Sequence, residues 1–351
     1  MILTNKNDRY FFYLVSFSFV LSLTVVALGA FTRLTEAGLG CPDWPGCYGF
    51  LTVPQTALEQ QTAAEFFPQT PLEPQKAWNE MLHRYIAGSL GVFILAINLM
   101  AWRQSSLPKL LPLLLLLMVT FQAVLGMWTV TLVLMPVVVM AHLLGGFTIV
   151  CLLWLLRLQL SSSVTKRDHI ESKTVSRLRI AAIISVMVVV CQIALGGWTA
   201  ANYAALVCTQ LPICEANWQQ LFDSKAFLLV QPQHESYQYG VLDYGQRVSI
   251  HVVHRLGAIV TTVVVLAMAW LCWLQLTLRR YSLVLVLLLT LQIALGVTNV
   301  VASLPVAVAV GHNITGLGLL VAMVTVSYRV RRCSQPALSV EQSLREEQSH
   351  G

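Results

Sequence analysis

Charged residues are scarce in this sequence. Asp, Glu, Lys and Arg together make up 11% of its 351 residues, whereas soluble domains contain about 25%. Hydrophobic residues make up 56%, and the mean hydropathy is +0.69. This composition excludes an ordinary soluble domain and predicts an integral membrane protein. The formal net charge of +6 is small, and membrane topology accounts for it, so we expect no nucleic-acid partner.

The sequence contains long apolar runs that are poor in charged residues. We find eight, each near the roughly 20 residues that cross the hydrocarbon core of a bilayer as a helix. The first run is too long for the apolar region of a signal peptide, and no small-residue cleavage site follows it cleanly, so we expect it to be a span too. The predicted fold class is an all-α membrane protein with eight transmembrane helices, over residues 11–30, 86–102, 110–130, 137–156, 180–201, 256–278, 282–300 and 306–327.

The basic residues gather on one side of the predicted spans. They precede the first run, follow the last, and lie in the connections after the second, fourth and sixth runs. The positive-inside rule makes this side cytoplasmic, with both termini inside a bacterial inner membrane. Two long connections, residues 35–79 and 204–246, then lie outside. The basic residues concerned are Lys6, Arg9, Arg103, Lys109, Arg157, Lys166, Arg167, Lys173, Arg177, Arg179, Arg279, Arg280, Arg329, Arg331 and Arg332.

The sequence contains an internal repeat. The motif Gln-x-x-Leu-Gly that starts at Gln122 recurs at Gln292, 170 residues later, and His142 recurs at His312 with the same offset. Such offsets over four spans identify two copies of one unit, and an even number of spans gives both copies the same orientation. We therefore predict two tandem, parallel-related four-helix bundles. The halves comprise residues 1–160 and 180–330, with a cytoplasmic linker at 161–179 and a cytoplasmic tail at 331–351.

Four histidines belong to the repeat. His83 and His254 stand at the outer ends of the second and sixth spans, and His142 and His312 at those of the fourth and eighth. Two imidazoles that face each other across a helical bundle form an axial pair for haem iron, and ionisable groups within membrane spans are candidates for function. Hydrogen bonding to a neighbouring helix is the simpler alternative. Zinc is weaker, because it wants further ligands nearby and only Glu80 offers one.

The two halves differ beside the first histidine of each pair. Glu80 lies three residues before His83, whereas His251 takes that place before His254. A spacing of three puts both members on one helix face. The carboxylate either serves as a base or electrostatic stabiliser or only stabilises the start of its helix. In the first case, the first half does chemistry and the second half holds a permanent haem.

Three arginines near the outer ends of the spans are candidates for binding haem propionates. Arg84 and Arg255 directly follow the histidines, and Arg33 follows the first span. A guanidinium pairs well with a carboxylate. The alternative is an arginine that extends toward lipid headgroups.

Four cysteines in the two long outer segments also follow the repeat. Cys41 and Cys47 match Cys208 and Cys214 at an offset of 167 residues. The outer side of a bacterial inner membrane is oxidising, so we expect a disulfide in each short loop. The second pair favours a structural role. The first pair is either structural or a redox-active pair that handles electrons near the first haem site.

Taken together, three motifs resemble the haem A synthases. They are Glu80-x-x-His83-Arg84, His254-Arg255-Leu-Gly, and the segment Thr32-Arg33-Leu-Thr-x-Ala-Gly-Leu-Gly-Cys41-x-Asp-Trp-Pro. Each motif alone is weak, but their combination is specific, and the resemblance covers nearly all eight spans.

The resemblance implies a function and assigns roles to the candidate residues. Members of this family oxidise a methyl group of haem O to a formyl group, which gives haem A for terminal oxidases. The family's haem B cofactor maps onto His254 and His312, and its substrate haem onto His83 and His142. Its essential carboxylate matches Glu80. The expected partners are haem O, the lipid bilayer and, from the pathway, the farnesyltransferase that makes haem O and oxidase assembly factors, together with a possible homo-oligomer.

Three other functions compete with this prediction. A di-haem b-type electron-transfer cytochrome needs the histidine pairs but not the Glu80 and His251 asymmetry. A membrane thiol oxidoreductase centred on the outer cysteines makes the histidines incidental. A transporter is disfavoured, because the sequence lacks the central helices broken by Gly or Pro that such proteins use.

Overall fold

The computed structural model describes residues 6–161 and 172–333, and in these residues every regular element is a helix, apart from an isolated bridge between Cys47 and Phe50. All eight predicted spans are confirmed as helices that are long and apolar enough to cross a membrane. The chain is therefore a multi-pass membrane protein. The spans are α1 (Lys6–Leu34), α3 (Pro74–Arg103), α4 (Leu110–Thr131), α5 (Pro136–Ser161), α6 (Ser172–Ala201), α7 (Tyr244–Trp273), α8 (Arg279–Val301) and α9 (Val306–Cys333).

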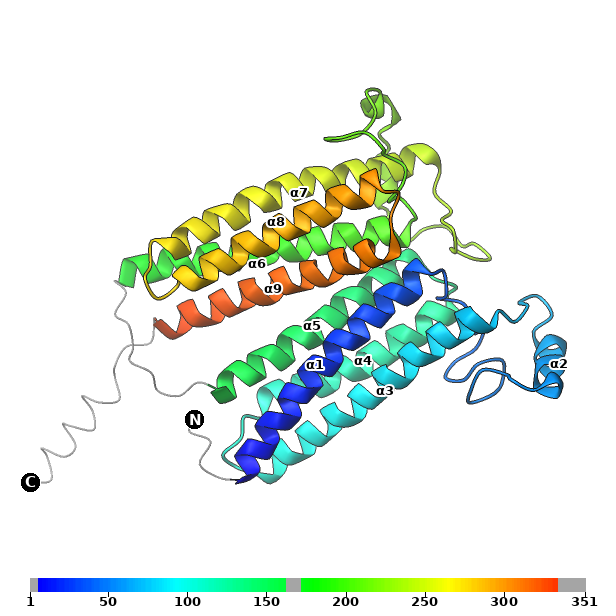
Figure 1. The fold of residues 1–351 in the computed structure, drawn as a ribbon, viewed down its shortest axis with the longest axis horizontal. Helices are drawn as coiled ribbons and strands as arrows, with labels where there is room; N and C mark the ends of the chain where they lie inside the picture. The colour runs from blue at the N-terminus through cyan, green and yellow to red at the C-terminus, as the bar shows by residue number, and fades with distance from the viewer. Residues whose placement is uncertain (1–5, 162–171, 334–351) are drawn as a thin grey trace, which may run out of the picture.

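Helices α1, α3, α4 and α5 form one bundle, and α6 to α9 form a second beside it (Figure 1). The same pairs pack together in each: α1 with α3 as α6 with α7, and α4 with α5 as α8 with α9. The predicted linker and tail fall partly outside the description, because residues 162–171 and 334–351, including Lys166 and Arg167, are not described. Helix α6 begins at Ser172 and α9 continues to Cys333, so both extend past the predicted spans.

The backbone repeats as faithfully as the sequence. Helix α1 ends with a residue in the left-handed region, Glu36 (φ 56°), and α6 ends the same way at Tyr203 (φ 53°), 167 positions later. The connection from α4 to α5 contains a left-handed pair at residues 133 and 134, and the α8–α9 connection repeats it at 303 and 304. Few non-glycine residues adopt this conformation, so its recurrence at the offsets of the sequence supports a duplication.

Both long connections lie at one end of the bundles, and the start of α1 and the end of α9 lie at the other (Figure 1). The first contains α2 (Ala57–Phe66), which the sequence pattern did not predict. Thr56 caps this helix in a capping box with Glu59. The second contains two short 3₁₀ helices, η1 (Trp218–Leu221) and η2 (Ser224–Phe227).

The two bundles contact each other through α1, α5, α6 and α9. Trp154 of α5 donates a hydrogen bond to the hydroxyl of Thr325 on α9 (2.7 Å). The second long connection also reaches the first bundle, where the Tyr237 amide donates to the carbonyl of Val133 (3.0 Å). The two halves thus contact each other both along their spans and at the end that carries the long connections.

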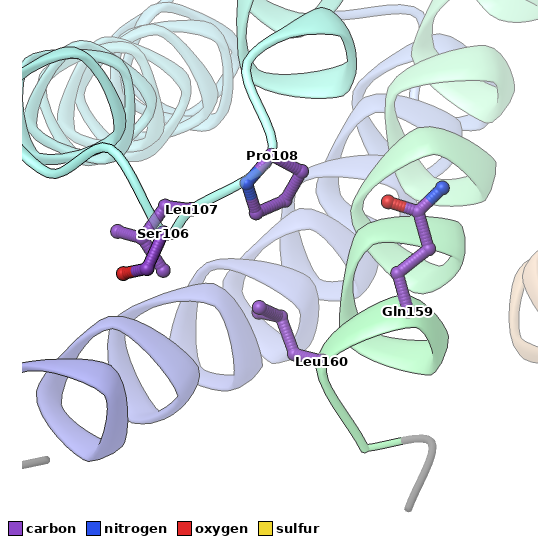
Figure 2. A pocket seen from close by; sticks show the side chains of 5 residues that line it. All are labelled: Ser106, Leu107, Pro108, Gln159 and Leu160. Atoms are coloured by element: carbon purple, nitrogen blue, oxygen red, sulfur yellow. The ribbon is translucent and has the colours of Figure 1, made fainter. Parts of the chain in front are cut away.

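A small hollow lies at the end of the first bundle away from the long connections. It measures about 270 Å³ and lies between the α3–α4 turn and the end of α5 (Figure 2). None of its lining residues is titratable, so it offers no catalytic or metal-binding group. They are Ser106, Leu107, Pro108, Gln159 and Leu160.

Candidate haem-binding site

One continuous cavity of about 1460 Å³ runs through both halves. All four repeat-related histidines line it, as does Glu80. Typical ligand pockets measure roughly 300–1,000 Å³, so the cavity has room for more than one large ligand. The structure thus brings together the residues that the sequence pattern singled out at four separate helix ends.

A glycine on the neighbouring helix makes room for each histidine ring. A Cβ placed on Gly29 of α1 would lie 3.0 Å from Cε1 of His83, and one on Gly196 of α6 would lie 3.2 Å from Cε1 of His254. Carbon atoms ordinarily approach to about 3.5–4.0 Å. Both glycines end the tripeptide Ala-Leu-Gly, which occurs at residues 27–29 and again at 194–196, and this close approach gives a reason for its recurrence. Gly126 and Gly296 lie in the same way against His142 and His312, at 3.5 and 3.1 Å.

One ring nitrogen, Nδ1, lacks a partner among the described residues in three of these histidines. Nδ1 of His83, His142 and His312 is buried and has no hydrogen-bond partner in the described chain. Buried polar groups in proteins are nearly always satisfied. Imidazoles that line a large cavity with free nitrogens, on rings held by close packing, have the donor chemistry of axial haem ligands. The residues present therefore fit a bound haem in each half.

The histidines of the second half have amide partners that those of the first half lack. Nε2 of Gln192 lies 3.1 Å from Nδ1 of His254 and donates to the His254 carbonyl at 3.0 Å. Nε2 of Gln292 lies 3.2 Å from Nε2 of His312. In the first half, Val25 takes the place of Gln192, and Nε2 of Gln122 is buried without a partner in the described residues. The sequence analysis missed this asymmetry, although the difference between Val25 and Gln192 at matching positions of the repeat could have shown it.

Glu80 is buried, with 5% of its surface exposed, and lines the cavity beside the first disulfide loop. Its Oε2 accepts a hydrogen bond from the backbone amide of Cys41 (2.9 Å), and its Oε1 pairs with Arg84. Nη1 of Arg84 in turn binds the loop carbonyls of Asp43 (2.9 Å) and Gly46 (2.5 Å). The carboxylate is therefore held by the Cys41–Cys47 loop and is not a freely solvated group at a helix start.

The second half repeats this arrangement with an imidazole. Nε of Arg255 donates to Nε2 of His251 (3.1 Å), and its two terminal nitrogens donate to carbonyls of the second loop, including those of Cys208 (2.6 Å) and Ile213 (2.8 Å). Arg84 and Arg255 thus anchor the two disulfide loops. Their predicted role with propionates stays a prediction, and it competes with these bonds.

Arg33 crosses from the first half to the second. Its Nη2 donates to the carbonyl of Ala200 at the end of α6 (2.9 Å), and its guanidinium stacks on the ring of Tyr203, 4.1 Å from the centroid. Nε of Arg33 is buried and unpaired in the described chain, and the side chain lines the cavity. Of the three arginines, Arg33 alone has a buried nitrogen without a partner in the described chain, and its role as a propionate ligand stays a prediction.

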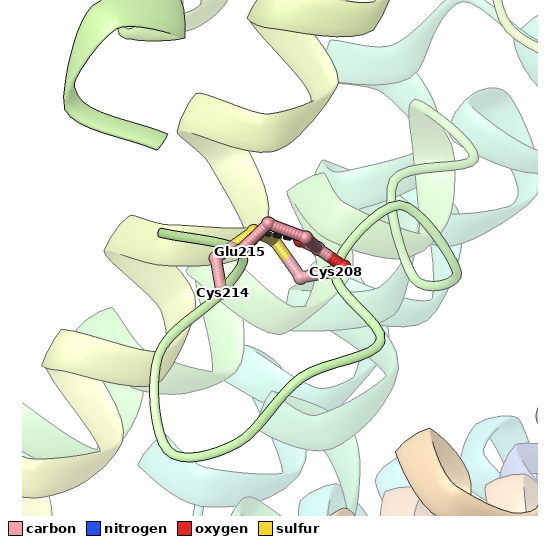
Figure 3. Close-up of side chains that lie close together, drawn as sticks. All are labelled: Cys208, Cys214 and Glu215. Carbon is pink, nitrogen blue, oxygen red and sulfur yellow. Dashed lines mark hydrogen bonds between the residues drawn. A yellow bond between two sulfur atoms is a disulfide. The ribbon is translucent and has the colours of Figure 1, made fainter. Parts of the chain in front are cut away.

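Both predicted disulfides are present, Cys41–Cys47 and Cys208–Cys214. Glu215 lies against the second, with Oε2 2.8 Å from Sγ of Cys214 (Figure 3). Burial raises the pKa of Glu215, but hydrogen bonds from Thr209 outweigh it and leave the pKa below its ordinary value. In the described chain this is the one grouping of three metal-ligating side chains, and its sulfurs are joined to each other, so the zinc alternative gains no support.

Comparison with known proteins agrees with this geometry. Residues 12–324 match the COX15-CtaA family, described as cytochrome oxidase assembly protein. A protein of Shewanella oneidensis named heme A synthase is 48% identical over 90% of this chain and 95% of its own length. Proteins of the same name from a Chelativorans species and from Halalkalibacterium halodurans are 28% and 23% identical, over 89% and 82% of this chain and 88% and 86% of theirs. The chain belongs to the COX15-CtaA family of cytochrome oxidase assembly proteins.

Proposed function

We propose that this protein is a haem A synthase, an oxidoreductase that converts a methyl group of haem O to a formyl group. The observation that carries the proposal is the pair of repeat-related histidine sites in one cavity, of which only the first has a buried carboxylate. A relative that is 48% identical over nearly its whole length bears the name heme A synthase. The family match to cytochrome oxidase assembly supports the same conclusion.

The first half binds the substrate. His83 and His142 hold the iron of haem O, and Arg33 is placed to bind a propionate. The Gly29 and Gly126 positions leave space for the two rings. Glu80 lies on the same helix face as His83, one turn nearer the outer end, and both line the cavity, so its carboxylate would lie near a haem held by His83.

The second half binds the resident cofactor, haem B, through His254 and His312. Gln192 fixes the orientation of the His254 ring through its contact with Nδ1. When bound, this haem supplies a one-electron redox centre near the substrate site. The absence of a carboxylate at the position of His251 suits a haem that stays unmodified.

The chemistry consists of two two-electron oxidations. In the first, a C–H bond of the methyl group breaks and water supplies the oxygen of a new C–O bond, with release of two electrons and two protons. The second gives a gem-diol in the same way, which loses water to leave the aldehyde. The net change is methyl plus one water to formyl, with four electrons and four protons released to an acceptor outside this chain. Glu80 stabilises positive charge that develops at the reacting carbon and accepts its proton.

Haem extraction from cells that express the protein with and without a supply of haem O tests the proposal. Haem A should form only when both are present. Glu80→Gln should abolish haem A and leave the resident haem in place, whereas Glu73→Gln, which changes an exposed carboxylate just before the same helix, should not affect either. A protein that binds haem B and never yields haem A would be an electron-transfer cytochrome instead.

A further inference from the structure

The cavity is deeper in the first half than in the second. On α3 its lining extends from His83 to Leu95, which is 12 residues or about 18 Å of helix. On α7 it ends at Thr262, eight residues or about 12 Å beyond His254. Leu116 on α4 also lines the deeper part. The repeat equivalents of these deep residues do not line the cavity: Leu266 on α7 for Leu95, and Val286 on α8 for Leu116.

Two glycines keep this α3–α4 branch open. A Cβ placed on Gly88 would meet nothing within 4 Å, and one on Gly91 would meet only a methyl group of Val119, at 4.0 Å. The second half has Ile259 and Thr262 at these positions. Thr262 still lines the cavity, whereas Ile259 is 53% exposed and does not, so the two halves differ in side-chain bulk at the outer edge of the branch.

The branch opens toward the outside of the bundle. Gly88 is exposed, and so are Leu95 (45%) on α3 and Thr120 on α4, although all three line the cavity. These residues lie on membrane-spanning helices, so the surface outside them is lipid. The branch thus joins the interior of the first half to the bilayer.

The inner end of the branch, where it meets His83 and His142, is polar, and the rest of its lining is apolar. At the inner end, Gln122 is 8% exposed with an unpaired Nε2, and Nδ1 of both His83 and His142 is unpaired in the described chain. Beyond these residues the lining on α3 and α4 is glycine, alanine, leucine, valine and threonine. Such a site fits a ligand with a metal-binding, polar head and one long apolar chain.

We infer that the α3–α4 branch binds the isoprenoid tail of the substrate haem and admits that haem sideways from the bilayer. This inference rests on the proposed function, because haem O carries such a tail and haem B does not. It also gives a steric reason for the different haems of the two halves: the second half lacks the deep part of the branch, which Leu95 and Leu116 line in the first half, and it accommodates a haem without a tail. The specificity residues are Gly88 and Gly91.

The test transfers the second-half residues into the first half. Gly88→Ile with Gly91→Thr fills the branch with side chains that α7 already carries. Purified holoenzyme in lipid nanodiscs is titrated with haem O and, separately, with haem B, by Soret absorbance, and the KM for haem O is measured. The double variant should bind haem O at least about tenfold more weakly, with a matching rise in KM. Its affinity for haem B at the first site should not change.

Ser89→Ile is the matched control. Ser89 is an exposed neighbour on the same helix that does not line the cavity, so the added bulk should leave haem O binding unchanged. If the double variant loses its resident haem, Gly91→Thr alone replaces it, with a smaller effect in the same direction.

The remaining results test the branch assignment and the proposed function separately. If wild-type protein converts haem O and the filled variant keeps the wild-type KM, the branch does not hold the tail. Equal weakening for haem O and haem B also overturns the inference, because it shows a general distortion of the site. If wild-type protein binds haem O more tightly than haem B but never converts it, the proposed function fails and the branch assignment stands.

Discussion

The contact between each histidine ring and a glycine allows a graded test of the first-half site. Gly29→Ala adds a Cβ at 3.0 Å from the His83 ring, whereas Gly126→Ala adds one at 3.5 Å from the His142 ring. Both substitutions add one methyl group to a helix that lines the same cavity. Because they differ chiefly in the closeness of the contact, each serves as the control for the other.

The expected magnitude follows from the distances. At 3.0 Å two carbons are about 0.5 Å inside the ordinary limit of approach, so the His83 ring must move by a few tenths of an ångström. Overpacking of this kind costs about 1–3 kcal/mol. If the cost falls on the haem-binding conformation, Gly29→Ala should weaken haem O binding by about 5- to 150-fold. Gly126→Ala makes an ordinary contact and should change binding by less than about threefold.

Soret titration with haem O measures both variants, and extraction of haem A from expressing cells reports the consequence for turnover. Thermal unfolding checks that both variants fold. Alanine stabilises a helix relative to glycine by about 1 kcal/mol, so helix propensity should not lower the unfolding temperature of either variant. Equal binding by the two variants and the wild type would refute the reasoning, and so would greater damage from Gly126→Ala than from Gly29→Ala.

Four further substitutions have defined outcomes. Arg84→Lys should lower the free energy of unfolding by about 2 kcal/mol or more, because lysine cannot bind the carboxylate and several carbonyls at once; unchanged thermal unfolding would contradict this. Replacing Cys41 and Cys47 together with serine should cost about 2–4 kcal/mol and reduce haem A formation, since the loop amide that holds the carboxylate is then free to move. Arg33→Ala removes hydrogen bonds and ring stacking between the halves, and limited proteolysis should detect faster cleavage of the outer connections. Gln192→Val copies the first-half residue and should weaken retention of the resident haem by about 1 kcal/mol, measured as faster haem transfer to an acceptor protein, with no change in haem O affinity.

The spans and the repeat could be predicted because they depend on local patterns. Apolar runs of helical length and offsets near 170 residues need no knowledge of packing. The two disulfides also followed, since a short loop in an oxidising compartment leaves few choices. His83 and its three repeat partners stand out in the sequence because they occur at matching positions in both copies of the repeat.

The contacts between side chains could not be predicted in the same way. Arg84 and Arg255 bind carbonyls of the two disulfide loops, which the sequence does not show, because the acceptor that a guanidinium reaches depends on the path of the loop; their binding of propionates stays a prediction. The short helix α2 has only ten residues and depends on its capping box, a weak signal in a long polar segment. In the sequence, Gly88 and Gly91 look like any other small residues of a span, because the space beside them depends on how α4 packs against α3.

The contact of Tyr237 with Val133 has a consequence for biosynthesis. The carbonyl of Val133 lies in the outer turn of the first bundle, yet its partner amide belongs to a segment that follows α6. Chains emerge from the ribosome N-terminus first, so the first four spans are inserted before this contact exists. This end of the first half is completed only after α6 and the segment that follows it have been synthesised. A nascent chain that stops before that point carries all the first-half histidines and Glu80 but lacks part of their outer cover, so the order of synthesis itself delays assembly of the finished site until the second half has arrived.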